Sequence, residues 1–212
     1  MKLKVCGLRE FENVREITEN TSPDFLGFIF YDKSPRCVDE EILSQVLQDL
    51  PASVKKVGVF VNATTAEMLE KAEKFHLDYL QLHGNEPVKQ CKELEEKGRK
   101  IIKAFGIRPQ FDFDQLQYYA PYVSFFLFDT KGEQEGGNGY AFDWQILKSY
   151  DQKVPFFLSG GISLENIQQV NDFLHLNIFA LDVNSKFEIS PGLKDVAKLK
   201  KLRNKMKDFN LK

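Results

Sequence analysis

The chain has 212 residues, of which 42% are hydrophobic and 28% charged, and its formal net charge is -2. These values are typical of a globular protein and favour neither a nucleic-acid nor a membrane partner. The opening residues MKLKVCGLRE lack the apolar segment of a signal peptide, and no apolar run is long enough to span a membrane. The three cysteines lack the spacing of a disulfide or zinc site, so we expect free thiols and a cytoplasmic protein.

Short apolar runs recur along the whole chain, and each predicts a β-strand. They begin about 21–30 residues apart, which leaves room for one strand, one loop and one helix per unit. Most are almost continuously apolar, as strands buried on both faces are. The eight runs are residues 3–7, 25–30, 55–61, 79–84, 100–107, 125–129, 154–161 and 178–183.

Helical patterns separate these runs. Thr64 and Glu67 have the spacing of a capping box, and an apolar stripe follows them. Further helices are predicted over residues 42–47, 167–174 and 196–202. The last of these carries several lysines, which we interpret as a solvated helix face in a chain that is acidic overall.

The alternation of strands and helices continues without a linker or a change in composition, which predicts one domain over residues 1–212. Right-handed crossovers repeated eight times close naturally into a (β/α)8 barrel of the α/β class. The alternative is an open, doubly wound sheet. It is disfavoured because no G-x-G-x-x-G motif follows the first run.

Active sites of such barrels lie at the C-terminal ends of the strands, and polar residues gather there in this sequence. Gly160 and Gly161 precede a helix expected to begin near Ser163, where backbone N–H groups would bind phosphate. Asn184 and Ser185 follow the eighth run and complete a candidate phosphate site. The alternative is that the two glycines form only a tight turn.

Two strand ends carry candidates for proton transfer. Asp129 follows four apolar residues, which favours the protonated form that a general acid needs, or else it caps its own loop. Cys6 ends the first run, where a thiolate would be a base or nucleophile and a thiol would be a small buried hydrophobe. Cys37 and Cys91 are expected to be of the second, buried kind.

Two further residues are candidates for substrate contact. Arg36, in the loop after the second run, suits bidentate binding of a carboxylate, with a plain surface arginine as the alternative. His83 is the one histidine at a strand end and is expected to contact substrate or to have a structural role. A single histidine there is too few for a metal site, so we expect no metal.

Eight segments distributed along the whole chain resemble, in the same order, segments of one known family. They are KVCGL (4–8), GFIFYDKSPRCV (27–38), VGVFVN (57–62), LQLHGNE (80–86), FLFDT (126–130), GGNGYAFDW (136–144), FLSGGISLENI (157–167) and LDVNSKFEISPGLKD (181–195). With these segments the chain resembles the phosphoribosylanthranilate isomerases of tryptophan biosynthesis.

The resemblance implies an Amadori rearrangement with Cys6 as the general base and Asp129 as the general acid. It also implies that Arg36 holds the anthranilate carboxylate and that Asp182 lies near the substrate hydroxyls. The SGG and NS segments would bind the phosphate of a small-molecule substrate. No metal and no organic cofactor would be needed, and we expect a monomer or a homodimer.

The chain departs from the family pattern at three positions. Asn138 and Tyr140 stand where threonine and often lysine are usual, and Lys186 replaces a glycine after the eighth run. The glycines of residues 131–139 would allow that loop to close over substrate. The alternatives are another phosphosugar isomerase or epimerase and a non-catalytic barrel that binds a phosphorylated ligand. The related isomerases have aspartate where Cys6 stands, and a binder needs no acid–base pair.

Overall fold

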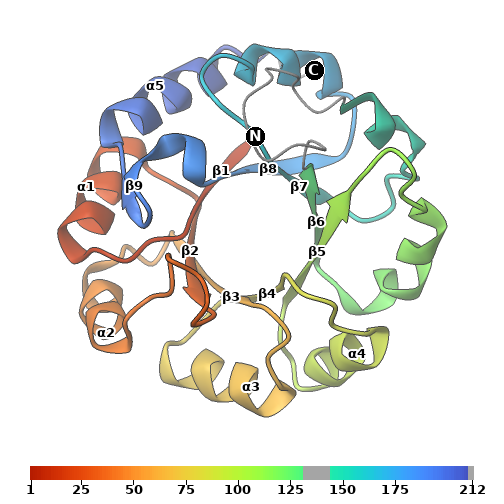
Figure 1. The fold of residues 1–212 in the computed structure, drawn as a ribbon, viewed down its shortest axis with the longest axis horizontal. Helices are drawn as coiled ribbons and strands as arrows, with labels where there is room; N and C mark the ends of the chain where they lie inside the picture. The colour runs from red at the N-terminus through yellow and green to blue at the C-terminus, as the bar shows by residue number, and fades with distance from the viewer. Residues whose placement is uncertain (131–143, 210–212) are drawn as a thin grey trace.

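The computed structural model describes residues 1–130 and 144–209. Eight parallel strands close into a barrel in chain order, with β1 paired to β8, and helices surround it (Figure 1). The strands are β1 (Lys2–Cys6), β2 (Phe25–Phe30), β3 (Lys55–Phe60), β4 (Tyr79–Leu82), β5 (Ile101–Ile107), β6 (Phe125–Thr130), β7 (Phe156–Ser159) and β8 (Ile178–Val183). The predicted barrel is confirmed, and the open sheet is wrong.

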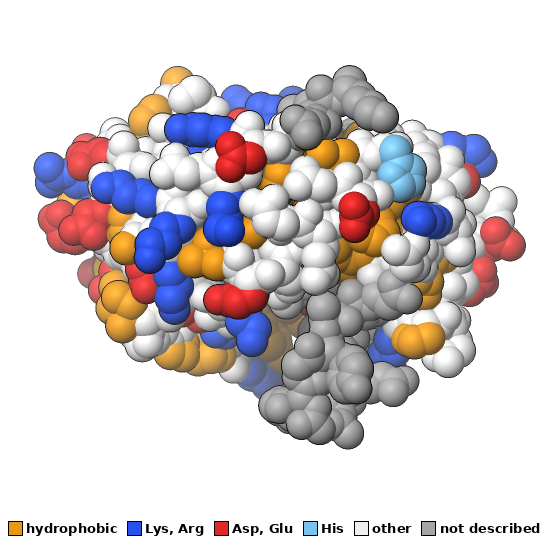
Figure 2. All heavy atoms as spheres, turned by 90° about the horizontal axis from the view of Figure 1, so that it is seen from above, with side chains coloured by type: hydrophobic (Ala, Val, Ile, Leu, Met, Phe, Trp, Pro, Cys, Tyr) orange, Lys and Arg blue, Asp and Glu red, His pale blue; other side chains and the backbone are white. Residues whose placement is uncertain are grey.

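The first four strands and the last are each followed by an α-helix. These are α1 (Phe11–Thr21), α2 (Glu40–Asp49), α3 (Thr65–Lys74), α4 (Val88–Glu96) and α5 (Val196–Lys207). The predicted capping box is present, because the Thr64 hydroxyl accepts a hydrogen bond from the backbone N–H of Glu67 and the Glu67 carboxylate accepts one from the backbone N–H of Thr64. Helix α5 buries its leucines and Met206, and on the side seen in Figure 2 basic side chains stand at the surface among acidic ones. None of the helices in the described ranges is long and apolar enough to cross a membrane.

The connections after β5, β6 and β7 contain 3-10 helices. They are η1 (Phe113–Tyr118), η2 (Ala120–Tyr122), η3 (Trp144–Ser149) and η4 (Ile167–Phe173). The helix predicted over 167–174 is present as the 3-10 helix η4, whereas the predicted helix start near Ser163 is wrong, because η4 begins at Ile167. The side chain of Asn166 accepts a hydrogen bond from the backbone N–H of Ser163 and donates one to the carbonyl of Gly161. These two bonds hold together the turn that precedes η4.

A short segment with secondary structure of its own connects β8 to α5. It contains η5 (Ser185–Phe187) and a hairpin of β9 (Glu188–Ser190) and β10 (Leu193–Lys194), which the sequence patterns did not predict. Gly192 in its turn has φ +90°, and a Cβ there would lie 2.6 Å from Arg9. Glycine is therefore needed for both the backbone conformation and the close approach.

The barrel interior is filled with side chains rather than hollow. Aromatic rings close its N-terminal half, with the ring centroids of Phe125 and Phe179 4.3 Å apart and those of Phe25 and Phe157 5.2 Å apart. Tyr79 packs against Phe25 at 5.7 Å. A second, larger apolar cluster lies between the strands and the surrounding helices. The aromatic layer leaves the C-terminal ends of the strands as the open end of the barrel.

Candidate active site

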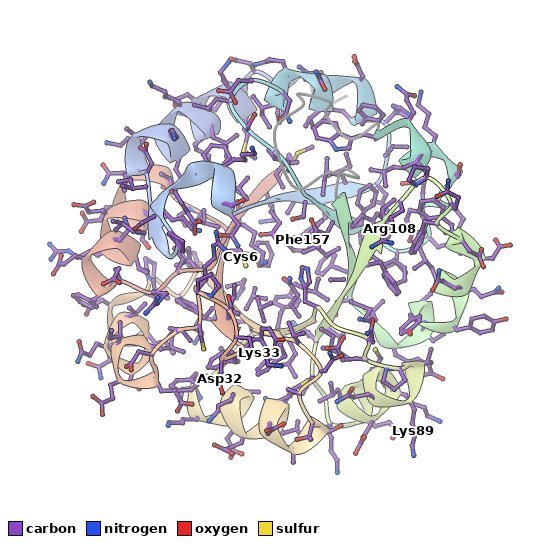
Figure 3. All side chains as sticks on the ribbon, viewed as in Figure 1. Cys6, Asp32, Lys33, Lys89, Arg108 and Phe157 are labelled. Atoms are coloured by element: carbon purple, nitrogen blue, oxygen red, sulfur yellow. The ribbon has the colours of Figure 1, made fainter. Side chains whose placement is uncertain are left out.

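Cys6 is the last residue of β1, and its side chain lies inside the ring of strands (Figure 3). The residue is 5% exposed. Its partner in the register is Gly27 on β2, and a Cβ at that position would lie 2.7 Å from the Cys6 sulfur. The glycine therefore makes the space that the thiol occupies. Cys6 is both a buried residue and a strand-end residue, so burial alone does not decide its role.

A buried lysine lies close to this thiol. The Nζ of Lys4, which is 0% exposed, is 2.9 Å from Asp182 Oδ2 and 2.7 Å from Gln81 Oε1. Burial alone would lower the pKa of Lys4, but the charges of Asp182 and Cys6 raise it above its ordinary value. The ammonium is thus kept charged inside the barrel.

The same charge acts on the candidate base. Burial and, to a lesser extent, the charge of Asp182 raise the pKa of the Cys6 thiol above its ordinary value, and Lys4 and Lys194 offset only part of this rise. A thiolate is the form that these two ammonium groups stabilise, and a thiolate is the form that can take a proton.

Asp129 lies near the end of β6 and faces His83, which follows β4. Asp129 Oδ2 is 3.6 Å from His83 Nε2, and the other ring nitrogen of His83 is 2.7 Å from Gln81 Nε2. Both ring nitrogens of His83 therefore face protein groups. The contacts form a continuous series from Lys4 through Gln81 and His83 to Asp129, which links strands β1, β4 and β6.

Asp182, on β8, joins this series through Lys4. Its Oδ2 accepts the bond from Lys4, whereas its Oδ1 is buried and has no hydrogen-bond partner among the residues the structure describes. A buried oxygen without a partner is costly, so this atom is available to a donor such as a substrate hydroxyl.

Arg36 lies in the loop after β2, and its guanidinium is held by Glu188 of the hairpin. Nε is 2.9 Å and Nη2 2.6 Å from the two carboxylate oxygens. Lys194 Nζ is also 2.6 Å from Glu188. Burial opposes ionisation of Glu188, but the bonds from Arg36 and Lys194 hold the pKa of its carboxyl below the ordinary value. The expected carboxylate-binding arginine is thus already oriented by a protein carboxylate, which uses its Nε and Nη2.

The candidate phosphate residues lie in two loops that follow neighbouring strands. Gly160 and Gly161, after β7, have φ of +88° and +66°, a conformation that favours glycine. Asn184, after β8, accepts a 2.6 Å bond from Lys194 through its Oδ1. The N–H groups that could face phosphate belong to a turn, since no helix begins at Ser163. The structure thus corrects the form of the expected site and leaves phosphate binding as a proposal.

Three residues of this region were missed by the sequence patterns: Lys4, Glu188 and Lys194. Gln81 is one of the polar residues at the strand ends but was given no role. Lys4 and Gln81 did carry a signal. Each is polar within an apolar run and lies two residues before Cys6 or His83, so that each pair shares one face of its strand. Glu188 and Lys194 stand in a hairpin that had not been predicted and left no such signal.

Cys91 is buried in α4, as predicted, whereas Cys37 is partly exposed. Among residues 1–130 and 144–209 no group of three histidine, cysteine, aspartate or glutamate side chains is arranged to hold a metal ion. Asn138, Tyr140 and the loop 131–139, whose glycines would allow closure, lie outside the described residues.

Comparison with known proteins gives the family. The sequence model of N-(5'-phosphoribosyl)anthranilate (PRA) isomerase matches residues 3–205. The chain belongs to this family. An N-(5'-phosphoribosyl)anthranilate isomerase of Parabacteroides distasonis is 48% identical over 94% of the chain and 90% of the relative. That of Phocaeicola vulgatus is 40% identical over 98% of each.

Solved structures of phosphoribosylanthranilate isomerases have the same fold. The enzyme of Thermotoga maritima superposes with a TM-score of 0.87 at 34% identity over 98% of each chain. A phosphoribosylanthranilate isomerase in complex with reduced 1-(o-carboxyphenylamino)-1-deoxyribulose 5-phosphate has a TM-score of 0.85 at 32% identity, again over 98% of each chain. The family resemblance seen in the sequence is confirmed.

One departure from the family pattern lies within the described residues. Lys186, in place of the usual glycine, is exposed and lies in η5. It is not among the residues with a positive φ. The turn after β8 therefore does not require glycine at this position.

Proposed function

We propose that the chain converts N-(5'-phosphoribosyl)anthranilate into 1-(o-carboxyphenylamino)-1-deoxyribulose 5-phosphate, with Cys6 as the general base and Asp129 as the general acid. One observation carries this assignment beyond family membership. Cys6 and Asp129 lie at the same end of one barrel, and the buried Lys4 is connected to both, electrostatically to Cys6 and through Gln81 and His83 to Asp129.

The first step opens the sugar ring. Asp129 gives a proton to the furanose oxygen, the bond between that oxygen and C1 breaks, and the anthranilate nitrogen supplies the electron pair that forms an iminium ion. The proton on the adjacent C2 becomes acidic, because the positive nitrogen accepts the electrons that its removal leaves behind.

The second step moves hydrogen from C2. The Cys6 thiolate takes the C2 proton, which leaves an enolamine with a hydroxyl on C2. A proton added at C1 and loss of the C2 hydroxyl proton to water then give the C2 carbonyl of the aminoketose. The substrate nitrogen accepts and returns the electron pair, so the step as written needs no metal or organic cofactor.

Binding groups fix the sugar between acid and base. Nη1 of Arg36 is available for the anthranilate carboxylate while Glu188 holds the other two nitrogens. Asp182 Oδ1 would accept from a sugar hydroxyl, and His83 lies beside the acid. The phosphate would bind at Gly160, Gly161, Asn184 and Ser185. Orientation of this kind lowers a barrier by up to about 7–11 kcal/mol in the best cases.

A coupled fluorescence assay tests the proposal. N-(5'-phosphoribosyl)anthranilate is generated in situ and its decay is followed with the wild type, Cys6→Ala and Asp129→Asn. We expect rapid decay with the wild type and a loss of about 10²–10⁴-fold in kcat for each variant, the usual contribution of general acid–base catalysis. KM should change little, because the lost interactions belong to the transition state.

A matched control comes from Cys91, which lies in α4 and whose pKa is raised by burial to about 11. Cys91→Ala should keep the wild-type kcat, since this thiol does not line the barrel. If the wild type does not accelerate the decay, the proposed function is wrong. The alternatives would then be another phosphosugar isomerase or epimerase and a non-catalytic binder. A normal kcat in Cys6→Ala would mean that another residue is the general base.

We also propose a cytoplasmic location and a monomeric or homodimeric state. The isomerase of Thermotoga maritima is described as dimeric, and monomers generated from it have been crystallised. Light scattering of the purified chain would distinguish the two states, and a larger assembly would contradict both.

A further inference from the structure

In the series of contacts from Lys4 through Gln81 to His83, the donor and the acceptor of each hydrogen bond can be assigned from the chemistry of the groups. The Lys4 ammonium only donates, so the Gln81 atom 2.7 Å away from it must be the amide oxygen. The amide nitrogen of Gln81 therefore points the other way, and it is 2.7 Å from His83 Nδ1. Because that amide nitrogen also only donates, Nδ1 must accept and carries no proton.

The tautomer of His83 is fixed by this arrangement. A neutral imidazole with a bare Nδ1 carries its proton on Nε2. Nε2 is the ring nitrogen that faces Asp129, at 3.6 Å from Oδ2. A proton on Nδ1 would instead face the amide hydrogens of Gln81. The backbone N–H of His83 also donates to the carbonyl of Phe60 at 2.8 Å, which anchors the residue at the end of β4.

We propose that Lys4 and Gln81 are positioning residues that hold His83 as the neutral tautomer with its proton on Nε2. This N–H then stabilises the carboxylate that Asp129 becomes after it has donated its proton. The inference rests on the proposed acid role of Asp129. It assigns a function to two buried residues to which the proposed mechanism gives no step.

The burial of the series supports this assignment. Lys4 is 0% and Gln81 1% exposed, so water does not offer Gln81 a competing partner. Asp182 on β8 is a further charged group near His83, and its Oδ2 is engaged by Lys4. At 3.6 Å the contact between His83 and Asp129 is longer than a hydrogen bond. Catalytic contacts often shorten only when substrate is bound, so we expect this one to shorten in the complex.

The tautomer can be measured in the resting protein by long-range ¹H–¹⁵N correlation of the imidazole groups. The exposed His76 and His175 serve as internal references, and His83→Asn assigns the third set of signals. We expect the wild type to show a protonated Nε2 and a bare Nδ1 at His83. A protonated Nδ1 would overturn the proposal.

Two substitutions of Gln81 test whether this residue determines the tautomer of His83. In Gln81→Glu both side-chain oxygens accept, so Nδ1 of His83 should become protonated. Gln81→Met removes the bond to Nδ1, should leave a mixture of tautomers, and remains informative if the glutamate variant does not fold. Both should lower kcat by about 10–100-fold, a part of the general-acid contribution, with KM within about twofold. An unchanged tautomer or an unchanged kcat in a folded variant would contradict the proposal.

The matched control is Gln90→Glu. Gln90 lies in α4, and its amide donates to the carbonyl of Ala63, away from the barrel interior. This variant should keep both the His83 spectrum and kcat. The spectrum of the wild type needs no substrate, so it tests the tautomer separately from the reaction. A protein with the expected tautomer but no isomerase activity would overturn the proposed function alone.

Discussion

The two ends of the barrel interior are built from the same eight strands and differ in almost every other respect. At the N-terminal end the interior is aromatic, with ring centroids of Phe125 and Phe179 only 4.3 Å apart. At the C-terminal end Cys6, His83 and Asp129 lie inside the same ring of strands. Apolar burial stabilises the fold at one end, and polar groups with defined partners are concentrated at the other. The difference indicates that stability and chemistry can be changed separately.

The largest effect on stability is expected for Phe157→Ala. Phe157 is 0% exposed, and its ring centroid lies 5.2 Å from that of Phe25 and 5.3 Å from that of Phe125. Truncation should lower the free energy of unfolding by about 3–5 kcal/mol, because it leaves a cavity among rings. Urea unfolding measures the loss, and kcat is measured at a temperature where the variant is folded.

The kcat of folded Phe157→Ala should stay within about twofold of the wild type, since only Cys6 and Asp129 are assigned to proton transfer. Phe157→Leu is the milder control and should lose less stability. A fall in kcat as large as that of Cys6→Ala would show that the aromatic layer positions the reacting groups, and the two ends would not be separable.

A smaller loss, which depends on pH, is expected at the open end for Glu188→Gln. The change leaves Lys194, whose side chain is 0% exposed, without its carboxylate partner and should cost about 3 kcal/mol at pH 7. The folded-state pKa of Glu188 is lowered, so its contribution is present above the unfolded value of about 4.3 and is lost as the pH falls through the folded value.

The measurement is urea unfolding of wild type and Glu188→Gln at pH 7 and at successively lower pH below about 4.3. The difference between the two proteins should shrink as the pH falls. KM should also rise, because Arg36 loses the bonds that orient it. A difference that is the same at every pH would mean that Glu188 acts through packing rather than through its charge.

The sequence predicts what depends on local pattern. The strands follow from apolar runs, and the positions of Cys6 and Asp129 follow from the strand ends, whereas their proposed roles come from the family resemblance. It does not predict contacts between distant residues: Lys4 and Asp182 are 178 positions apart, and Arg36 and Glu188 are 152 apart. The helix expected from residue 163 begins later, at Ile167, and is a 3-10 helix. The stripe of apolar residues predicts that a helix packs against the barrel, but it does not predict where that helix begins or which type it is.

The smallest effect is expected for Thr64→Ala. Thr64 lies in the loop after β3, at the same end of the barrel as Cys6, but its side chain caps α3 and accepts from Glu67 N at 3.2 Å. Loss of the cap should cost about 1 kcal/mol of unfolding free energy, and Thr64→Ser should restore most of it. Both kcat and KM should remain those of the wild type in the coupled assay. Thr64 and Cys6 share an end of the barrel and differ in whether the side chain faces its interior. A reduced kcat in Thr64→Ala would therefore mean that the catalytic region extends into the loops and is not confined to the inward-facing residues.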